Sequence, residues 1–336
     1  MVNDWQKRDQ KNCFIVSGFA TILAFVVVLL GAYTRLTDAG LGCPDWPGCY
    51  GEWIISKSTA IQNPNMDPTK AWTEMIHRYL AGLLGLTIFL LNYFILWRRR
   101  LFDQVSVLSL TLLGLVIFQA LLGMWTVTHN LSPLIVMAHL LGGMTTLSLL
   151  WWLTLNLKPK TLKNPIRKST RSLKVMAGLS LSVLWLQLFL GGWTSANYAA
   201  LVCLDFPECH KNQTMKYHII EAFALTTPEI TKPFDHATLA TIHMLHRFGA
   251  LLTALMIGGL ALFAYFRIRH HQLRVLSTLL GVLLLIQIGL GITNVLSVLP
   301  LSIAVAHNGV AGLLLLVLIT FNVYLYTHSM RNSYVL

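Results

Sequence analysis

The chain has 336 residues, of which 55% are hydrophobic and only 11% carry a charge. Soluble domains carry charge on roughly a quarter of their residues, so this composition excludes an ordinary soluble protein and is typical of a surface that faces lipid. The formal net charge of +12 does not indicate nucleic-acid binding, because the basic residues lie between apolar stretches and not on one soluble face.

Apolar stretches close to the roughly 20 residues that cross a bilayer as a helix recur along the chain. The first follows Lys7, Arg8 and Lys11 and is longer than the core of a signal peptide. It has no small-residue cleavage site at a suitable distance, so we expect it to remain as a helix. The sequence predicts an all-α membrane protein with eight transmembrane helices, at residues 14–34, 71–96, 105–128, 134–156, 175–197, 239–266, 275–297 and 301–327.

Positive charge predicts the orientation of these helices. The segments 35–70 and 198–238 are poor in Lys and Arg and carry most of the acidic residues. Because cytoplasmic loops are enriched in Lys and Arg, we expect both termini in the cytoplasm and these two long loops outside. Lys and Arg gather at the N-terminus, at 98–100, at 158–174 and at 267–274.

Four of the five cysteines lie in the two predicted outer loops. Cys43 and Cys49 form one pair and Cys203 and Cys209 the other, each with five residues between its members. Outside a bacterial inner membrane, or in an intermembrane space, such pairs favour disulfides. A zinc site is the alternative, but the loops lack the closely spaced second Cys or His pair that zinc requires. We expect Cys13, on the cytoplasmic side, to be a free thiol.

The chain contains an internal repeat. Residues 43–49 match 203–209 with Cys, Asp, Pro and Cys in register, and residues 74–79 match 243–248. Four helices return the chain to the same side of the membrane, so the repeat is parallel. It predicts two pseudo-two-fold-related four-helix bundles, with their axis along the membrane normal: residues 1–165 and residues 166–336.

Four histidines occupy equivalent positions in the two halves, His77 and His139 in the first and His246 and His307 in the second. Each lies within about two turns of the outer end of its predicted helix. Facing helices of a four-helix bundle can supply two imidazoles to one haem iron, so the pattern predicts one haem site in each half. The alternative is that each histidine is hydrogen-bonded inside its bundle without a ligand.

Arginines directly follow two of these histidines, at Arg78 and Arg247. A guanidinium at this depth requires an anion, and haem propionates would supply one through bidentate contacts. The alternative is that both side chains extend to the outer headgroups.

The repeat is broken at Glu74, one helical turn before His77, because the equivalent position in the second half is His243. A carboxyl group is therefore expected beside one haem only, where it can move protons or stabilise developing positive charge. The alternative is an ion pair between Glu74 and a neighbouring arginine.

Taken in order, these motifs resemble those of the haem A synthase family over essentially the whole chain, and the paired loop cysteines resemble those of its bacterial branch. The motifs are Arg35-Leu36-Thr37 with Gly40-Leu41, Glu74-x-x-His77-Arg78, Leu122-Gly123-x-Trp125-Thr126-Val127-Thr128, His139, Gly192-x-Thr194 with Asn197, His246-Arg247, and His307.

The resemblance implies an oxidoreductase that converts haem O to haem A for respiratory terminal oxidases, by oxidising the C8 methyl group to a formyl group through successive hydroxylations. It implies that His77 and His139 face the substrate haem O, that His246 and His307 hold a haem b cofactor, and that Glu74 is the catalytic glutamate. It also implies a bacterial inner membrane, with haem O synthase and terminal oxidase assembly as candidate partners and an electron donor that the sequence does not identify.

Two other classes of protein share part of this pattern. A di-haem b-type electron-transfer protein would have both histidine pairs, but it does not account for the difference between Glu74 and His243 or for the outer cysteines. A transporter would have the two-fold repeat, but transporters usually have interrupted helices near the midplane of the membrane. The polar groups here cluster near the outer end instead.

Overall fold

The computed structural model describes residues 4–158, 171–209, 217–224 and 234–329. Within these residues the chain forms long α-helices and no β-strand, and eight helices are long and apolar enough to cross a membrane. This confirms the predicted all-α membrane protein. The eight are α1 (Asp4–Leu36), α3 (Pro68–Trp97), α4 (Arg99–Thr128), α5 (Pro133–Leu157), α6 (Arg171–Ala196), α8 (His236–Arg267), α9 (His271–Leu296) and α10 (Leu301–Ser329).

Seven of the eight helices begin earlier than hydropathy predicts, most clearly α1, which begins at Asp4 and not near residue 14. Hydropathy marks only the apolar part of a helix, whereas the first turns of α1 are polar and are held by neighbouring elements. Asp9 lies 3.4 Å from the Arg98 guanidinium, and the Gln10 amide donates to the carbonyl of Leu157 at 3.3 Å. The basic segment predicted at 158–174 lies mostly outside the described residues.

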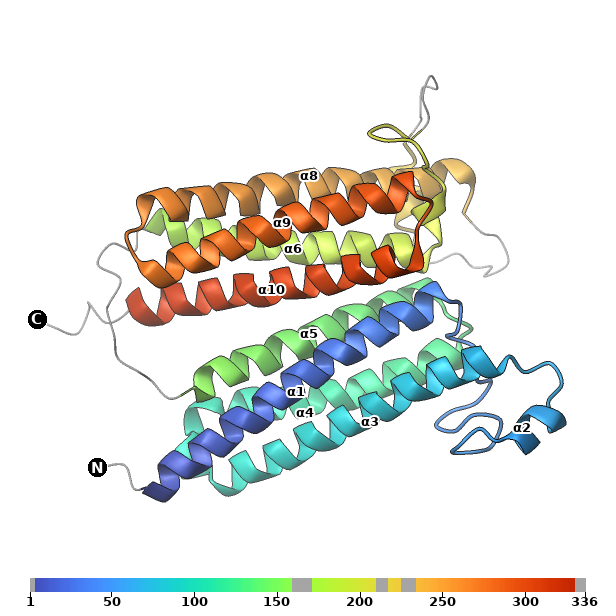
Figure 1. The fold of residues 1–336 in the computed structure, drawn as a ribbon, viewed down its shortest axis with the longest axis horizontal. Helices are drawn as coiled ribbons and strands as arrows, with labels where there is room; N and C mark the ends of the chain where they lie inside the picture. The colour runs from blue at the N-terminus through green and yellow to red at the C-terminus, as the bar shows by residue number, and fades with distance from the viewer. Residues whose placement is uncertain (1–3, 159–170, 210–216, 225–233, 330–336) are drawn as a thin grey trace, which may run out of the picture. The chain divides into compact units, whose positions relative to one another are not determined.

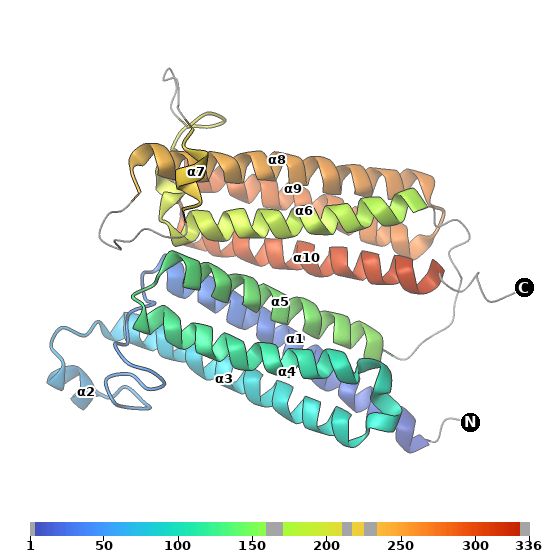
Figure 2. The same cartoon turned by 180° about the vertical axis from the view of Figure 1, so that it is seen from behind.

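The chain divides into two compact units, unit 1 (Met1–Asn164) and unit 2 (Pro165–Leu336). In unit 1, α1 and α4 each pack against both α3 and α5, so α3 and α5 lie at opposite corners of a four-helix bundle (Figure 1). In unit 2, α6 and α9 each pack against both α8 and α10, which therefore lie at opposite corners of the second bundle (Figure 2). Each bundle thus places its second and fourth long helices diagonally across its interior.

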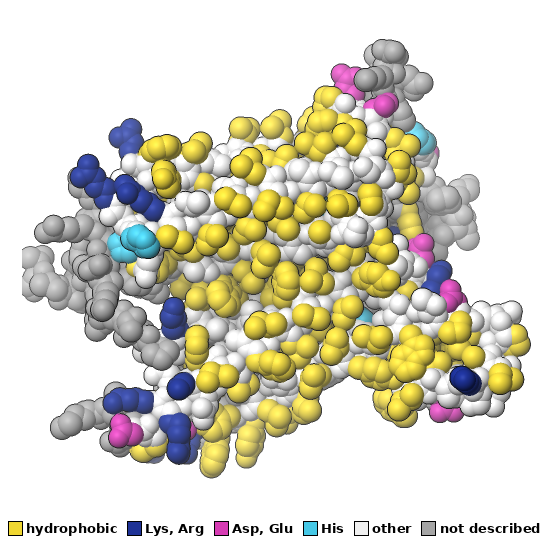
Figure 3. Space-filling model, in the orientation of Figure 1, with side chains coloured by type: hydrophobic (Ala, Val, Ile, Leu, Met, Phe, Trp, Pro, Cys, Tyr) yellow, Lys and Arg dark blue, Asp and Glu magenta, His cyan; other side chains and the backbone are white. Residues whose placement is uncertain are grey.

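Buried polar side chains link neighbouring helices within each bundle. The Asn92 amide of α3 donates to the Ser109 hydroxyl of α4 at 2.9 Å, and the Asn322 amide of α10 donates to the Ala177 carbonyl of α6 at 3.2 Å. Hydrogen bonds of this kind stabilise helix packing where lipid offers no alternative partner. Figure 3 shows apolar side chains along the flanks of the helices. Lys and Arg gather in unit 1 at the end where α3 joins α4, and in unit 2 at the end where α8 joins α9.

The two long loops lie at the opposite end of the helices from these basic residues and contain the short helices α2 (Lys57–Gln62), η1 (Ala199–Leu201) and α7 (Ile219–Ala222). Asp67 begins α3 by accepting from the backbone N–H of Thr69 at 2.9 Å, with Pro68 in the first helical position. Asp235 begins α8 in the same way, accepting from the Thr238 N–H at 2.9 Å. These caps fix where the first histidine-bearing helix of each unit begins.

Candidate functional site

The two histidines of unit 1 belong to the diagonal helices, His77 to α3 and His139 to α5. Each ring lies against a glycine on an adjacent helix. A Cβ built on Gly31 of α1 would lie 3.2 Å from His77 Cε1, and one on Gly123 of α4 would lie 3.4 Å from His139 Cε1. The absent side chains leave room for the two imidazoles in the bundle.

Unit 2 repeats this arrangement with His246 on α8 and His307 on α10. A Cβ on Gly191 of α6 would lie 3.0 Å from His246 Cε1, and one on Gly291 of α9 would lie 3.2 Å from His307 Cε1. Sequence reasoning missed these four contacts, because each one joins two different helices and leaves no local signal in the sequence.

The chemistry of this donor set fits haem. Among the described residues, the Nδ1 atoms of His77, His139 and His307 are buried without a hydrogen-bond partner. No group of three or more His, Cys, Asp or Glu side chains that could enclose a bare metal ion is found in the part of the chain that the structure describes. Two imidazoles from opposite corners of a bundle are what a haem iron needs as axial ligands, since the porphyrin supplies the other four nitrogens.

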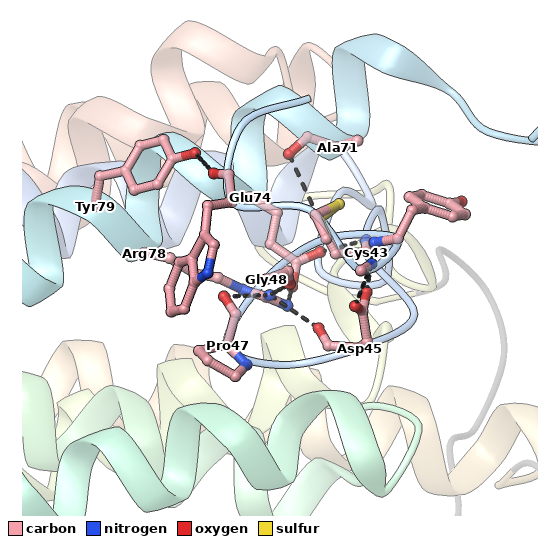
Figure 4. Close-up of a disulfide and its surroundings, with 12 residues drawn as sticks. Cys43, Asp45, Pro47, Gly48, Ala71, Glu74, Arg78 and Tyr79 are labelled. Carbon is pink, nitrogen blue, oxygen red and sulfur yellow. Dashed lines mark hydrogen bonds and ion pairs between the residues drawn. A yellow bond between two sulfur atoms is a disulfide. The ribbon is translucent and has the colours of Figure 1, made fainter. Parts of the chain in front are cut away.

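Glu74 is buried, with 4% of its surface exposed, and both carboxylate oxygens are engaged. Oε2 accepts from the backbone N–H of Cys43 at 2.9 Å, and Oε1 is ion-paired with the guanidinium of Arg78. Figure 4 shows Glu74 and Arg78 converging beside the Cys43 disulfide. The ion pair named as an alternative from the sequence is therefore present, and it lies one turn from His77.

Arg78 and Arg247 hold the two disulfide-bonded loops by their backbone carbonyls. Arg78 Nη1 donates to the carbonyls of Asp45 at 2.9 Å and Pro47 at 3.3 Å, and also to that of Gly48 (Figure 4). Arg247 has four such acceptors, the carbonyls of Cys203, Asp205, Pro207 and Glu208, at 2.7–3.2 Å. Sequence reasoning missed this role because a backbone carbonyl leaves no mark in the sequence.

Both expected disulfides are present, joining Cys43 to Cys49 and Cys203 to Cys209. They are buried against equivalent turns of the two units: the first packs with Ala71 and Met75 of α3, and the second with Ala240 and Met244 of α8. Cys13 is a buried free cysteine, as expected. Each disulfide-bonded loop therefore covers the N-terminal end of the helix that carries the first histidine of its unit.

The units differ in how this loop is attached at the position of Glu74. In unit 2 the equivalent His243 is buried, and its Nδ1 lies 3.0 Å from the Ala199 carbonyl, to which it donates. Unit 1 thus has a carboxylate where unit 2 has an imidazole, and the carboxylate bonds directly to the disulfide residue Cys43.

Replacing Arg247 by Lys should loosen the second loop while leaving the first intact, because an ammonium group cannot reach four carbonyls at once. Loss of one hydrogen bond to a charged group costs about 1.5–3 kcal/mol, so we expect Cys203–Cys209 to be reduced roughly tenfold to hundredfold faster. The reduction rate of each disulfide is measured by timed reduction, alkylation and mass mapping of protein isolated without reductant. The Cys43–Cys49 disulfide of the same molecule is the control. The assignment would be contradicted if Cys203–Cys209 were reduced at the same rate in the variant and in the parent.

These features define a multi-pass membrane protein with two histidine-paired four-helix bundles, each with a disulfide-bonded loop. Among the described residues, a buried carboxylate lies one turn from a paired histidine in unit 1 and not in unit 2. The family described as cytochrome oxidase assembly protein, COX15-CtaA, matches residues 15–319. The chain belongs to this family.

Curated relatives cover nearly the whole chain. A heme A synthase of Shewanella oneidensis is 43% identical over 324 residues, which are 93% of this chain and 96% of the relative. Heme A synthases of Granulibacter bethesdensis and Rickettsia prowazekii are 27% and 24% identical, covering 98% and 89% of this chain and 91% and 93% of those proteins.

Proposed function

We infer that this chain is an oxidoreductase that converts haem O to haem A by oxidising the C8 methyl group of the porphyrin to a formyl group. Family membership and 43% identity to a heme A synthase over most of the chain support this reaction. The observation that carries the assignment of the active site is the placement of a buried carboxylate one turn from a paired histidine in unit 1 alone.

Unit 1 is the proposed substrate site, in which His77 and His139 hold haem O. Unit 2 is the proposed cofactor site, in which His246 and His307 hold haem b. When bound, haem b supplies one-electron transfer toward the substrate. The glycines that face the four histidines support both sites, because they keep space for two imidazole rings in each bundle.

Glu74 is the proposed catalytic residue. Its hydrogen bond from Cys43 and its ion pair with Arg78 fix the carboxylate at the outer end of α3, close to the position of a substrate held by His77. A fixed carboxylate there holds or moves a proton, or stabilises positive charge that develops at the methyl carbon during oxidation.

Arg78 and Arg247 are proposed to contact haem propionates in addition to the loop carbonyls. Arg247 Nε is buried without a partner among the described residues, so this N–H remains available to an anion. A guanidinium that binds both the loop and a propionate would join each disulfide-bonded cap to the haem beneath it.

We propose a bacterial inner membrane as the location, with both termini cytoplasmic and both disulfide-bonded loops outside. Haem O synthase and the terminal oxidase assembly machinery are the proposed partners, since one makes the substrate and the other uses the product. Reporter domains that are active on only one side of the membrane, fused after residue 336 or inserted in the first outer loop, should report opposite sides. The same side for both would contradict this orientation.

The pigments that copurify with the protein test the proposed reaction against its rivals. We expect haem b together with haem O, haem A or a hydroxylated intermediate in chromatograms of the extracted pigments. Haem b alone would indicate a di-haem b-type electron-transfer protein. No haem at all would indicate a transporter, and either result would overturn the proposed function.

A further inference from the structure

Three of the four histidine-facing glycines share a second feature, a glutamine one turn earlier on the same helix. The fourth glycine, Gly31 of α1, has Val27 at that position. Val27 is equivalent to Gln187 in the repeat, so the helix of unit 1 that faces His77 lacks the glutamine that the other three glycine-bearing helices have. The three pairs are Gln119 with Gly123, Gln187 with Gly191, and Gln287 with Gly291.

Two of these glutamines contact a histidine ring. Gln187 Nε2 is 3.0 Å from His246 Nδ1 and donates to the His246 carbonyl at 3.1 Å. Gln287 Nε2 is 3.2 Å from a ring nitrogen of His307. A glutamine side chain has both an NH2 group and a carbonyl oxygen, so each glutamine can offer a ring nitrogen either a donor or an acceptor.

Gln119 approaches α5 in the same region of unit 1. Its side chain is only 9% exposed and its Nε2 is buried without a partner among the described residues. The amide occupies space that a Cβ on Gly142 would fill, three residues after His139. Gln119 thus offers a polar group beside α5, as Gln187 does beside α8 and Gln287 beside α10.

The partner helix changes together with the glutamine. In unit 2, Gly249 lies three residues after His246, and a Cβ there would lie 2.3 Å from Gln187 Oε1, so the glycine makes room for the amide. The equivalent residue after His77 is Leu80. The Gln187–Gly249 pair of unit 2 is therefore replaced by Val27 and Leu80 in unit 1, two apolar side chains without a hydrogen-bonding group.

This exchange changes how firmly a histidine is held. A histidine that ligates a metal is normally oriented by a hydrogen bond at its other ring nitrogen, and loss of that partner costs on the order of 10–100-fold in affinity. Backbone carbonyls are near the rings of His77, His139 and His307 alike, those of Val27, Gln119 and Gln287 respectively. The side-chain amide is what His77 lacks.

We propose that His77 is the exchangeable histidine of the substrate site, whereas His139 holds the haem throughout and His246 and His307 are both permanent ligands. This rests on the proposed function and deepens it. Two permanent histidines in unit 1 would leave no free coordination position at the substrate iron. Release of His77 opens that position on the side of α3, the helix that also carries Glu74.

The proposal is tested by placing the Gln–Gly pair of unit 2 at Val27 and Leu80 of unit 1, and the Val–Leu pair of unit 1 at Gln187 and Gly249 of unit 2. The probe is carbon monoxide, which binds ferrous haem only at an open position, added to dithionite-reduced full-length protein loaded with haem O without oxygen. In the parent we expect the haem O to bind carbon monoxide and the haem b not to. V27Q/L80G should lower binding at haem O by about tenfold, and Q187V/G249L should make haem b reactive.

The result that overturns the proposal is unchanged carbon monoxide binding at both haems in these two variants. If V27Q/L80G does not retain haem O, single substitutions of the ligands decide the question. His77→Ala should keep haem O in a high-spin form, and His139→Ala should lose it, whereas the reverse pattern would make His139 the exchangeable ligand. Failure of the proposed function is separately visible, because the parent would then yield neither haem O nor haem A among its pigments.

Discussion

Replacing Glu74 by Gln should stop haem A formation while the protein inserts, keeps haem b and still binds haem O. Glutamine preserves the shape of the side chain and can accept from the Cys43 N–H, so the disulfide-bonded loop should stay in place. It lacks the charge and the transferable proton, whose loss typically costs 10²–10⁴-fold in rate, so we expect a fall of about that size. Haem O or a hydroxylated intermediate should accumulate in the extracted pigments.

The repeat supplies a matched control for this substitution. His243→Gln makes the same type of change at the equivalent buried position of unit 2, and it should leave haem A formation near the parent level. Normal haem A from Glu74→Gln would remove Glu74 from the mechanism. Loss of both haems from Glu74→Gln would make it a structural residue, which its bonds to the loop and to Arg78 would then explain.

Replacing His246 or His307 by Ala should remove most of the tightly bound haem b and its low-spin spectrum. Each histidine would supply one of the two protein ligands of the haem iron, so its loss should leave the cofactor with a single ligand. Haem A formation should fall with haem b content, since the proposed electron path would be broken. Optical spectra of purified variants, with pigment analysis, measure both quantities.

His243→Ala is the control for the haem b prediction, because it removes a buried imidazole from the same helix without removing a proposed ligand. It should retain the low-spin haem b spectrum. Full low-spin haem b in purified His246→Ala and His307→Ala would show that unit 2 does not hold the cofactor through these residues.

Much of this molecule could be predicted from its sequence, because the constraints that shape it act on residue type. Lipid requires long apolar helices, an oxidising compartment favours the pairing of Cys43 with Cys49, and the internal repeat predicts equivalent positions for His77 and His246 in the two bundles. The polar start of α1 was missed because its first turns are held by tertiary contacts such as Asp9 to Arg98 and not by lipid.

The parts that could not be predicted depend on backbone groups and on pairings between distant helices. The carbonyls that Arg247 binds have no residue signature, and the sequence suggested propionates because it showed only a buried charge. The glutamines were different. Gln119 and Gln287 are equivalent in the repeat, whereas Gln187 corresponds to Val27, so the sequence itself contains this pattern, although none of these side chains is titratable.

The central claim is that this chain itself oxidises haem O. The most direct test is to express the full chain in a bacterial host that makes haem O but has no haem A synthase activity, and to separate the extracted haems by chromatography. We expect haem A to appear with the parent chain and to be absent with Glu74→Gln expressed at the same level in the membrane. Haem O and haem b alone, from cells in which the parent chain is correctly inserted, would contradict the assignment.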